Sequence, residues 1–194
     1  MSIPVTRLDE SAREALRRHF LSLAAEDVRL RFGSALAPAG IEQYVAEIDF
    51  DRDAVLGAHD EELELAGAAH VAFTGDMAEL GISVLPGHRG RGVGGALLAR
   101  AVEHARNRFV DRLYMHCLAE NATMMHLARK LGMRICVDTG EAEAFLTLPP
   151  PDPASVAGEF VQQRFALFDY ALKAEAASLR RIADALRPEP EAKR

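Results

Sequence analysis

Cysteine and long hydrophobic runs are scarce in this sequence of 194 residues. Its two cysteines, Cys117 and Cys136, each lie in a strand-like stretch, and we expect both to be buried and reduced. No apolar run approaches the roughly 20 residues of a membrane-spanning helix. Residues 1–7 lack the hydrophobic segment of a secretory signal. These absences lead us to expect a cytoplasmic protein with no membrane partner.

Basic residues are also fewer than acidic ones: the chain has 23 Lys and Arg and 29 Asp and Glu, which gives a formal net charge of −6. Such a balance argues against nucleic acid as a partner. The charge is uneven, since residues 88–134 hold nine basic and three acidic residues, a local charge of +6. A basic centre in an acidic chain suits a small polyanion, although a solvated helix face explains any single arginine equally well.

Several motifs of metal, phosphate and thiol chemistry are missing. The seven histidines are scattered without H-E-x-x-H or a similar spacing, so we expect no metal. No G-x-x-x-x-G-K-[ST] motif occurs, which excludes the phosphate loop of nucleotide triphosphatases. Cys117 has no histidine or aspartate placed by the sequence to activate it as a nucleophile.

The chain does contain a glycine-rich loop between an apolar strand and an amphipathic helix. Five of the nine residues from 87 to 95 are glycine, so a phosphate group can lie directly against backbone N–H groups. The positive N-terminal end of the following helix favours an anion there, and Arg89 and Arg91 add full charges. This stretch predicts a phosphate-binding loop.

The same loop matches the dinucleotide fingerprint G-x-G-x-x-G through Gly90, Gly92 and Gly95. Its context argues against that interpretation in two ways. The fingerprint begins at the end of the first strand, but residues 85–89 intervene here, and it needs an acidic residue at the end of the next strand. Asp111 precedes that strand instead. A dinucleotide-binding oxidoreductase is therefore the weaker alternative.

Read as R-x-x-G-x-G from Arg89 onward, the loop resembles the acyl-CoA pyrophosphate loop of the GNAT superfamily of N-acetyltransferases. Residues 121–133 run from asparagine to Gly-Met and resemble that family's Asn-started helix, which ends in Gly-Phe. The resemblance is clear over residues 79–133 and extends over residues 3–148. It implies transfer of an acetyl group from acetyl-CoA to a primary amine of a small molecule or to a protein lysine, without a metal.

The resemblance also assigns roles to individual residues. Glu79 resembles the general-base glutamate of the bacterial protein-lysine acetyltransferase branch, although a solvated or ion-paired glutamate explains it equally well. The position of the family's frequent general-acid tyrosine is Ala128 in this sequence. Tyr114, which lies elsewhere in the sequence, is an alternative candidate for that role. The missing tyrosine leaves open a catalytically silent acyl-CoA-binding sensor. The residues expected to hold acetyl-CoA are Ile82, Ser83, Val84, Arg89, Gly90, Arg91, Gly92, Val93, Gly94, Gly95 and Asn121.

We expect an α/β GNAT fold over residues 1–148, with a mixed, mainly antiparallel sheet that has helices on both faces. The sheet should splay near Val84, where acyl-CoA enters. Apolar periodicity predicts that the helix of residues 92–109 buries Phe109 with the rest of its apolar face. The other expected helices are residues 11–32, 38–48 and 121–132, and the expected strands are residues 3–7, 54–59, 63–73, 78–84, 113–118, 135–137 and 142–148.

Beyond that domain, residues 149–153 form a proline-rich linker, residues 154–187 a helical extension and residues 188–194 a polar tail. The apolar residues of the extension recur at heptad spacing, broken once at Glu175. We expect this seam to make a homodimer; the alternative is a helix that breaks near residues 173–178 and bends back over its own domain. The seam consists of Val161, Phe165, Phe168, Leu172, Leu179, Ile182 and Leu186.

Acidic residues are concentrated in the N-terminal half of the chain. They would attract a cationic acceptor such as lysine, a polyamine or an aminoglycoside. Solvated turns explain the same residues equally well. They are Asp49, Asp51, Asp53, Asp60, Glu61, Glu62 and Glu64.

Overall fold

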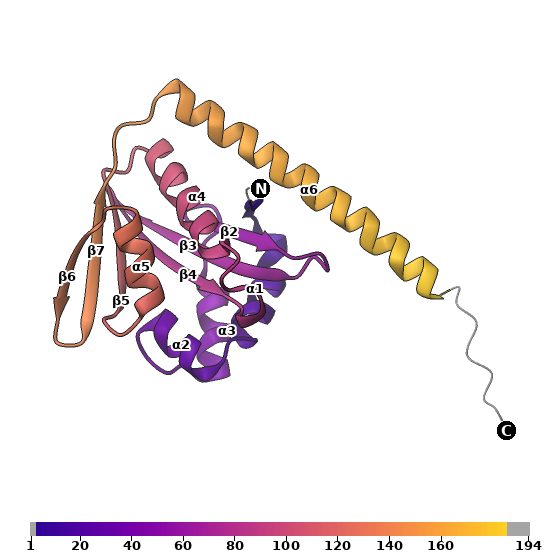
Figure 1. Cartoon of the computed structure of the whole chain (residues 1–194), viewed down its shortest axis with the longest axis horizontal. Helices are drawn as coiled ribbons and strands as arrows, with labels where there is room; N and C mark the ends of the chain where they lie inside the picture. The colour runs from indigo at the N-terminus through magenta and orange to yellow at the C-terminus, as the bar shows by residue number, and fades with distance from the viewer. Residues whose placement is uncertain (1–2, 186–194) are drawn as a thin grey trace.

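A seven-stranded sheet forms the centre of the molecule, and the computed structural model describes residues 3–185 (Figure 1). The strand order is β1-β2-β3-β4-β5-β7-β6, and all neighbours are antiparallel except β4 and β5, which are parallel. The expected mixed, mainly antiparallel sheet is confirmed. The strands are β1 (Thr6–Leu8), β2 (Ala54–His59), β3 (Leu65–Thr74), β4 (Met77–Val84), β5 (Arg112–Leu118), β6 (Arg134–Asp138) and β7 (Glu141–Thr147).

Helices cover both faces of the sheet because successive side chains of each strand point to opposite sides. On one face, Leu16 and Phe20 belong to a core built with α1, α2 and α3. On the other, Leu80 and Leu97 belong to a core built with α4 and α5. The helices are α1 (Arg13–Leu21), α2 (Ala25–Phe32), α3 (Pro38–Glu47), α4 (Val93–Asn107), α5 (Ala122–Lys130) and α6 (Pro153–Ala185), with the short turns η1 (Glu10–Ala12) and η2 (Pro86–His88).

The small residues of β3 let α4 lie close to the sheet. A Cβ atom on Gly67 would come within 2.8 Å of Val93 Cγ1 and 3.0 Å of Leu97 Cδ1. Any side chain at this position would therefore push the helix away, because the neighbouring atoms are themselves buried in the core. This contact fixes the start of α4 against the sheet and with it the glycine-rich loop.

The parallel pair β4–β5 separates after a short paired stretch. Paired residues run from Met77 with Arg112 to Glu79 with Tyr114, yet β4 continues to Val84 and β5 to Leu118. Both strands therefore diverge toward their C-terminal ends, which is the expected splay. The glycine-rich loop follows β4 directly, so it lies at the same end of the sheet as the divergence.

Two expectations about buried side chains are wrong. Phe109 is 78% exposed, because α4 already ends at Asn107. Phe109 itself adopts a left-handed backbone angle that turns the chain, and Val110 is buried in its place. Cys117 is buried as expected, but Cys136 is exposed. Cys136 lies on β6, the last strand of the sheet, whose residues have few neighbours.

The C-terminal extension forms one continuous helix, α6, which lies along the domain in Figure 1. The alternative with a break near residues 173–178 is therefore wrong. The heptad seam faces away from the domain: Phe168 is 62% exposed and Ile182 is 55% exposed, whereas Ala166 is buried. Leu186 and residues 188–194 lie outside the described residues. α6 thus docks with its polar side and leaves its apolar side uncovered.

Glu159 anchors α6 to α4. Its carboxylate accepts hydrogen bonds from Arg100 at 2.9 Å, from His104 Nδ1 at 2.6 Å and from Asn107 at 2.6 Å. Burial opposes ionisation of Glu159, but the hydrogen bonds from His104, Asn107 and Arg100 outweigh it and lower the pKa to about 2. The ionised form of Glu159 is therefore the form that the folded chain stabilises.

Replacing Glu159 with glutamine is expected to destabilise the docked helix at pH 7, because buried Arg100 loses its nearer carboxylate and keeps only Glu103 at 3.9 Å. We expect a loss of about 1–3 kcal/mol in the free energy of unfolding, measured by chemical denaturation. The folded pKa lies below the ordinary value of 4.5, so the contribution of Glu159 is present above that value and fades as the pH falls toward 2. The deficit of Glu159→Gln should shrink over the same range, while exposed Glu175→Gln serves as the control. An equal deficit at pH 7 and pH 3 would contradict this account.

Candidate active site

The glycine-rich loop presents open backbone at the start of α4. Gly90 and Gly92 adopt left-handed backbone angles, with φ of +72° and +90°, that other residues rarely adopt. Gly92 is the N-cap of α4 and supplies no side-chain hydrogen bond to it. Cβ atoms placed on Gly90 and Gly95 would meet no atom within 4 Å. The first N–H groups of α4 therefore face open space, which suits an anion.

The two arginines of the loop point in different directions. Arg89 donates from Nε to the Val84 carbonyl at 3.1 Å and pairs with Asp27 of α2 at 2.7 Å. Arg91 is exposed and lines a hollow of about 510 Å³ between the start of α4 and Phe165 of α6. Only Arg89 thus lies between the loop and the divergence of β4 and β5.

The other residues expected to bind acetyl-CoA differ in which of their atoms a ligand can reach. Ile82 and Val93 are core residues, so only their backbone is available to a ligand. A Cβ atom on Gly94 would lie 3.5 Å from Leu127 Cδ1, which places the loop against α5. Ser83 is buried, and its hydroxyl lies 2.7 Å from Nε2 of His19.

Asn121 has a structural role at the start of α5, as its expected N-cap position implies. Its Oδ1 accepts a hydrogen bond from the Met124 backbone at 3.1 Å. Its Nδ2 donates to the Leu30 carbonyl at 3.3 Å. The side chain therefore joins α5 to α2 across the diverging strands, and Gly132 ends the helical segment with a left-handed φ of +70°.

Glu79 lies at the point where β4 and β5 part, beside Tyr114. Its side chain is exposed. The Tyr114 hydroxyl donates to Glu143 at 3.1 Å, and burial together with Glu143 and Glu79 raises the pKa of Tyr114 to about 12. Tyr114 therefore keeps its proton at neutral pH. Within residues 3–185, the side chain of Glu79 makes no hydrogen bond or ion pair and lies beside Tyr114.

A polar network that sequence reasoning missed lies on the same face of β4 as Glu79. Arg31 of α2 donates to the Tyr44 hydroxyl at 3.0 Å, and that hydroxyl lies 2.7 Å from Nδ1 of His70. Nε2 of His70 lies 3.0 Å from Asp53, which is 2% exposed. The four side chains come from two helices, a strand and a loop. No spacing in the sequence could have revealed them.

The network has a consistent direction of hydrogen bonding. Burial lowers the pKa of His70, so its ring is neutral at pH 7 and carries one proton. Burial opposes ionisation of Asp53, but Arg52 and His70 hold its pKa below the ordinary value. Nε2–H of His70 therefore donates to Asp53, and Nδ1 accepts from Tyr44, which in turn accepts from Arg31.

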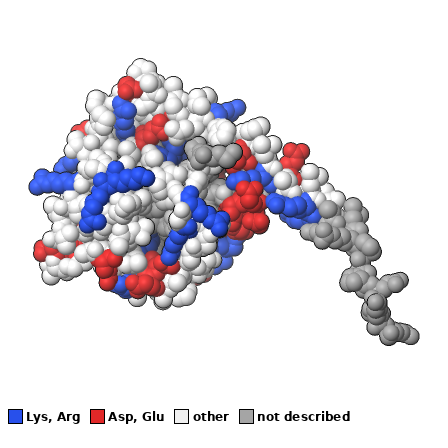
Figure 2. All heavy atoms as spheres, viewed as in Figure 1, with Lys and Arg blue, Asp and Glu red and all other residues white. Residues whose placement is uncertain are grey.

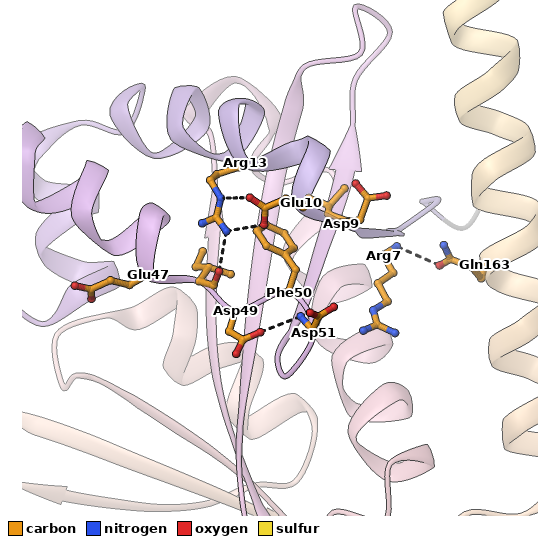
Figure 3. Close-up of a pocket in the computed structure, with 11 residues that line it drawn as sticks. Arg7, Asp9, Glu10, Arg13, Glu47, Asp49, Phe50, Asp51 and Gln163 are labelled. Atoms are coloured by element: carbon orange, nitrogen blue, oxygen red, sulfur yellow. Dashed lines mark hydrogen bonds and ion pairs between the residues drawn. The ribbon is translucent and has the colours of Figure 1, made fainter.

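Apart from Asp53, which lies on the same face of the sheet as Glu79, the acidic residues of the N-terminal half do not gather around Glu79. Asp49 and Asp51 line a hollow of about 680 Å³ between β1, the end of α3 and α6 (Figure 3). Arg13 there is already bound to Glu10 and to the Ile48 carbonyl, so its charge is compensated. The four acids of the β2–β3 turn, Asp60, Glu61, Glu62 and Glu64, lie at the opposite end of β2.

Figure 2 shows acidic and basic side chains interspersed on the face seen in Figure 1. No broad region of a single sign dominates that face.

The model of the Acetyltransferase (GNAT) family matches residues 16–133, more than half of the chain. The chain belongs to the GNAT acetyltransferase family. A relative, the streptothricin acetyltransferase of Streptomyces lavendulae, is 31% identical over 101 residues, which make up 45% of this chain and 53% of that protein. The chain thus spans about half the length of this relative.

Solved GNAT structures share the fold. The GNAT domain of PAT from S. lividans has a TM-score of 0.64 and 22% identity, covering 74% of this chain and 89% of that one. The ribosomal-protein-alanine N-acetyltransferase of Brucella melitensis has a TM-score of 0.56 and 23% identity, covering 74% of this chain and 99% of that one. At such identities the likeness concerns the fold alone.

Ala128 stands where the family resemblance predicts the general-acid tyrosine. Ala128 is 1% exposed and packs in the core between α5 and the sheet, so this position presents no polar group. Within residues 3–185 no group of three His, Cys, Asp or Glu side chains could hold a metal ion. Among the helices of the described part, none is both long and apolar enough to cross a bilayer.

Proposed function

We propose that this GNAT chain is an acetyl-CoA-dependent N-acetyltransferase that acts on a primary amine of a small molecule or on a protein lysine. The observation that carries the proposal is the parting of β4 and β5 directly after Glu79 and Tyr114. The open glycine-rich loop lies at the same end of these strands. Under this proposal, a long ligand with a phosphate group at one end runs from the loop along the diverging strands toward Glu79.

Under this proposal, the backbone N–H groups of residues 91–95 hold the pyrophosphate of acetyl-CoA, and the backbone of residues 82–84 orients its thioester arm. Acetyl-CoA supplies the activated acetyl group. Open backbone around Gly90 and Gly95 supports the fit, because a Cβ there would occupy space that the anion needs. Arg89 lies beside the loop, where its charge attracts the same anion once Asp27 releases it.

The chain's own proton chemistry would then begin at Glu79. An amine is protonated at neutral pH and has to lose a proton before it can attack. Exposed Glu79 is placed to accept that proton, directly or through a water molecule. Tyr114 holds a proton close by, since its pKa is raised to about 12. Tyr114 is our candidate for returning a proton to the leaving group in place of Ala128; because its raised pKa makes it a weak acid, solvent or the acceptor's own proton is the alternative donor.

We expect the acceptor amine to reach Glu79 from the open part of the sheet. Glu79, Glu143 and Glu141 lie there with Tyr114 and His116, in positions next to one another on β4, β5 and β7. Such a group of carboxylates attracts an ammonium ion. Streptothricin, named in one relative, belongs in any panel of acceptors for this reason.

A mass-spectrometric assay with acetyl-CoA and a panel of amines tests the proposal. The expected result is acetylated product from at least one amine class, with no product when acetyl-CoA is left out. CoA that binds tightly without any product would favour the sensor. Thermal protection by NADH and not by CoA would favour an oxidoreductase.

We also propose that α6 pairs with a second copy of the chain. Its seam residues repeat at heptad spacing, which is the pattern by which helices pair with one another. At 1.5 Å per residue, its 33 residues span about 50 Å, and the seam is exposed at Val161, Phe165, Phe168, Leu172, Leu179 and Ile182. An uncovered apolar stripe of this length is unfavourable in water.

A charge placed in the middle of the seam is expected to separate the copies. We expect a dimer at micromolar concentration by light scattering, and a monomer after Phe168→Glu. Phe168 is 62% exposed, so its replacement should leave the melting temperature of the monomer nearly unchanged. Arg181→Glu, which places the same charge on α6 outside the seam, is the control. A wild-type monomer under these conditions would show that the seam has another role.

A further inference from the structure

Arg31 is a positive charge without an acidic partner among residues 3–185. Its neighbours on α2 are all paired: Arg29 contacts Glu26 and Glu120, and Asp27 contacts Arg89. Arg31 instead donates only to the neutral Tyr44 hydroxyl. Its Nε atom is buried and has no hydrogen-bond partner. Arg31 as a whole is half-buried, and an unsatisfied donor on a buried part of a charged group is costly.

The guanidinium of Arg31 occupies the place of a missing side chain on β4. A Cβ atom on Gly81 would lie 2.2 Å from Cζ of Arg31, so the group lies directly on the strand. Gly81 is two residues from Glu79, and both face the same side of the sheet. Two residues of strand correspond to about 7 Å. Arg31 and Glu79 are therefore neighbouring groups on the side from which an acceptor comes.

The surroundings hold Arg31 in place but do not neutralise it. The rings of Phe20, Phe32 and Tyr44 lie 6.0, 4.9 and 5.7 Å from its Cζ. The two nearby histidines are uncharged at pH 7, because burial lowers the pKa of His70 and lowers that of His19 to about 4. The carboxylate of Asp53 reaches Arg31 only through His70 and Tyr44.

We propose that Arg31 binds a carboxylate of the substrate, and that the acceptor is an amino acid-like molecule with a carboxylate close to its amine. The planar fork of arginine matches a carboxylate, and Nη1 is the guanidinium nitrogen that is neither hydrogen-bonded nor buried among the described residues. When the carboxylate of the acceptor binds Arg31, the amine of the same molecule can lie beside Glu79, about 7 Å away along β4. The inference rests on the acetyltransferase function proposed above and narrows its acceptor.

The carboxylate bound by Arg31 could instead belong to the acyl donor, as in the acyl group of a dicarboxylic acyl-CoA such as succinyl-CoA. The acceptor is the better source because Arg31 and Glu79 share one face of β4, so one small molecule can reach both. Tyr44, His70 and Asp53 are positioning residues under this proposal, since each acts on the substrate only through Arg31.

Matched pairs of substrates test the proposal in the full chain. L-amino acids and their carboxamides are compared with acetyl-CoA as donor, and acetyl-CoA is compared with succinyl-CoA. We expect wild type to prefer the carboxylates by about 10- to 100-fold in kcat/KM, and Arg31→Met to abolish that preference. Arg31→Lys should retain part of it, and Tyr44→Phe should weaken it. Arg29→Met, a paired arginine of the same helix, is the control that should keep it.

A binding measurement separates this inference from the proposed function. Calorimetry in the presence of CoA compares N-acetylglycine with N-acetylglycinamide, and NMR follows the Nε–H resonance of Arg31. Tighter binding of the carboxylate, lost in Arg31→Met, supports the inference even if no amine is acetylated. A preference for succinyl-CoA that disappears in Arg31→Met supports the carboxylate site with the acyl group as its source. Equal binding of acid and amide, with no dependence on Arg31 for either donor, would overturn it.

Discussion

Replacing Gly92 with valine is expected to weaken CoA binding by at least about 100-fold, while Arg91→Ala weakens it by about 10-fold or less. Gly92 has a φ of +90° at the N-cap of α4, where valine is strained and its Cβ would lie 3.7 Å from Ile3 Cδ1, so the backbone expected to meet the pyrophosphate would have to shift. Arg91 is exposed and contributes only a screened charge. Calorimetry with CoA measures both variants.

A matched glycine separates backbone strain from lost binding. Gly140 has the same φ of +90°, but it lies in the turn between β6 and β7, away from the loop. Gly140→Val should lower the melting temperature as Gly92→Val does, yet leave CoA affinity unchanged. Unchanged affinity in Gly92→Val would show that CoA does not lie against the start of α4.

The second large effect is expected at Glu79. If this carboxylate accepts the proton of the amine, Glu79→Gln should lower kcat by roughly 100-fold or more and leave binding of acetyl-CoA nearly intact. The deficit should shrink at high pH, because the amine then loses its proton to solvent. Stopped assays of kcat between pH 7 and pH 10, together with calorimetry for acetyl-CoA, measure both parts.

Two further variants make the interpretation of Glu79 sharper. Glu62→Gln removes an exposed carboxylate from the β2–β3 turn and should leave kcat unchanged. Tyr114→Phe should lower kcat most at high pH, where a proton donor is scarce. Full activity of Glu79→Gln at neutral pH would return Glu79 to the role of a solvated glutamate at the end of a strand.

Much of the fold could be predicted from short stretches of sequence. Asn121 caps α5 as its position implied, and Gly132 ends that helical segment with a left-handed angle. Hydrogen bonds within a few residues, together with apolar periodicity, decide such features, so they are visible in the sequence itself. The family resemblance was visible for the same reason, because its loop motif is local.

Side-chain environments at the ends of elements were harder to predict. Phe109 continues the apolar face of α4 by spacing, yet the helix ends two residues earlier and the side chain is exposed. Cys136 lies in an apolar stretch, but it is on the last strand of the sheet. Whether an apolar residue is covered depends on what lies next to it in space, and periodicity gives no information on that.

The sequence by itself determined most elements of this protein, the place of its glycine-rich loop and its likeness to the GNAT family, although the one helix expected over residues 11–32 is in fact α1 and α2. Only the tertiary structure decided that α6 docks through Glu159 and turns its apolar seam outward, since the partners Arg100 and Glu159 are 59 residues apart. The same holds for Arg31, which lies on Gly81 some 50 residues away along the chain. Such contacts depend on how the helices pack against the sheet, which is decided by many weak interactions acting together. No local pattern of residues encodes that outcome.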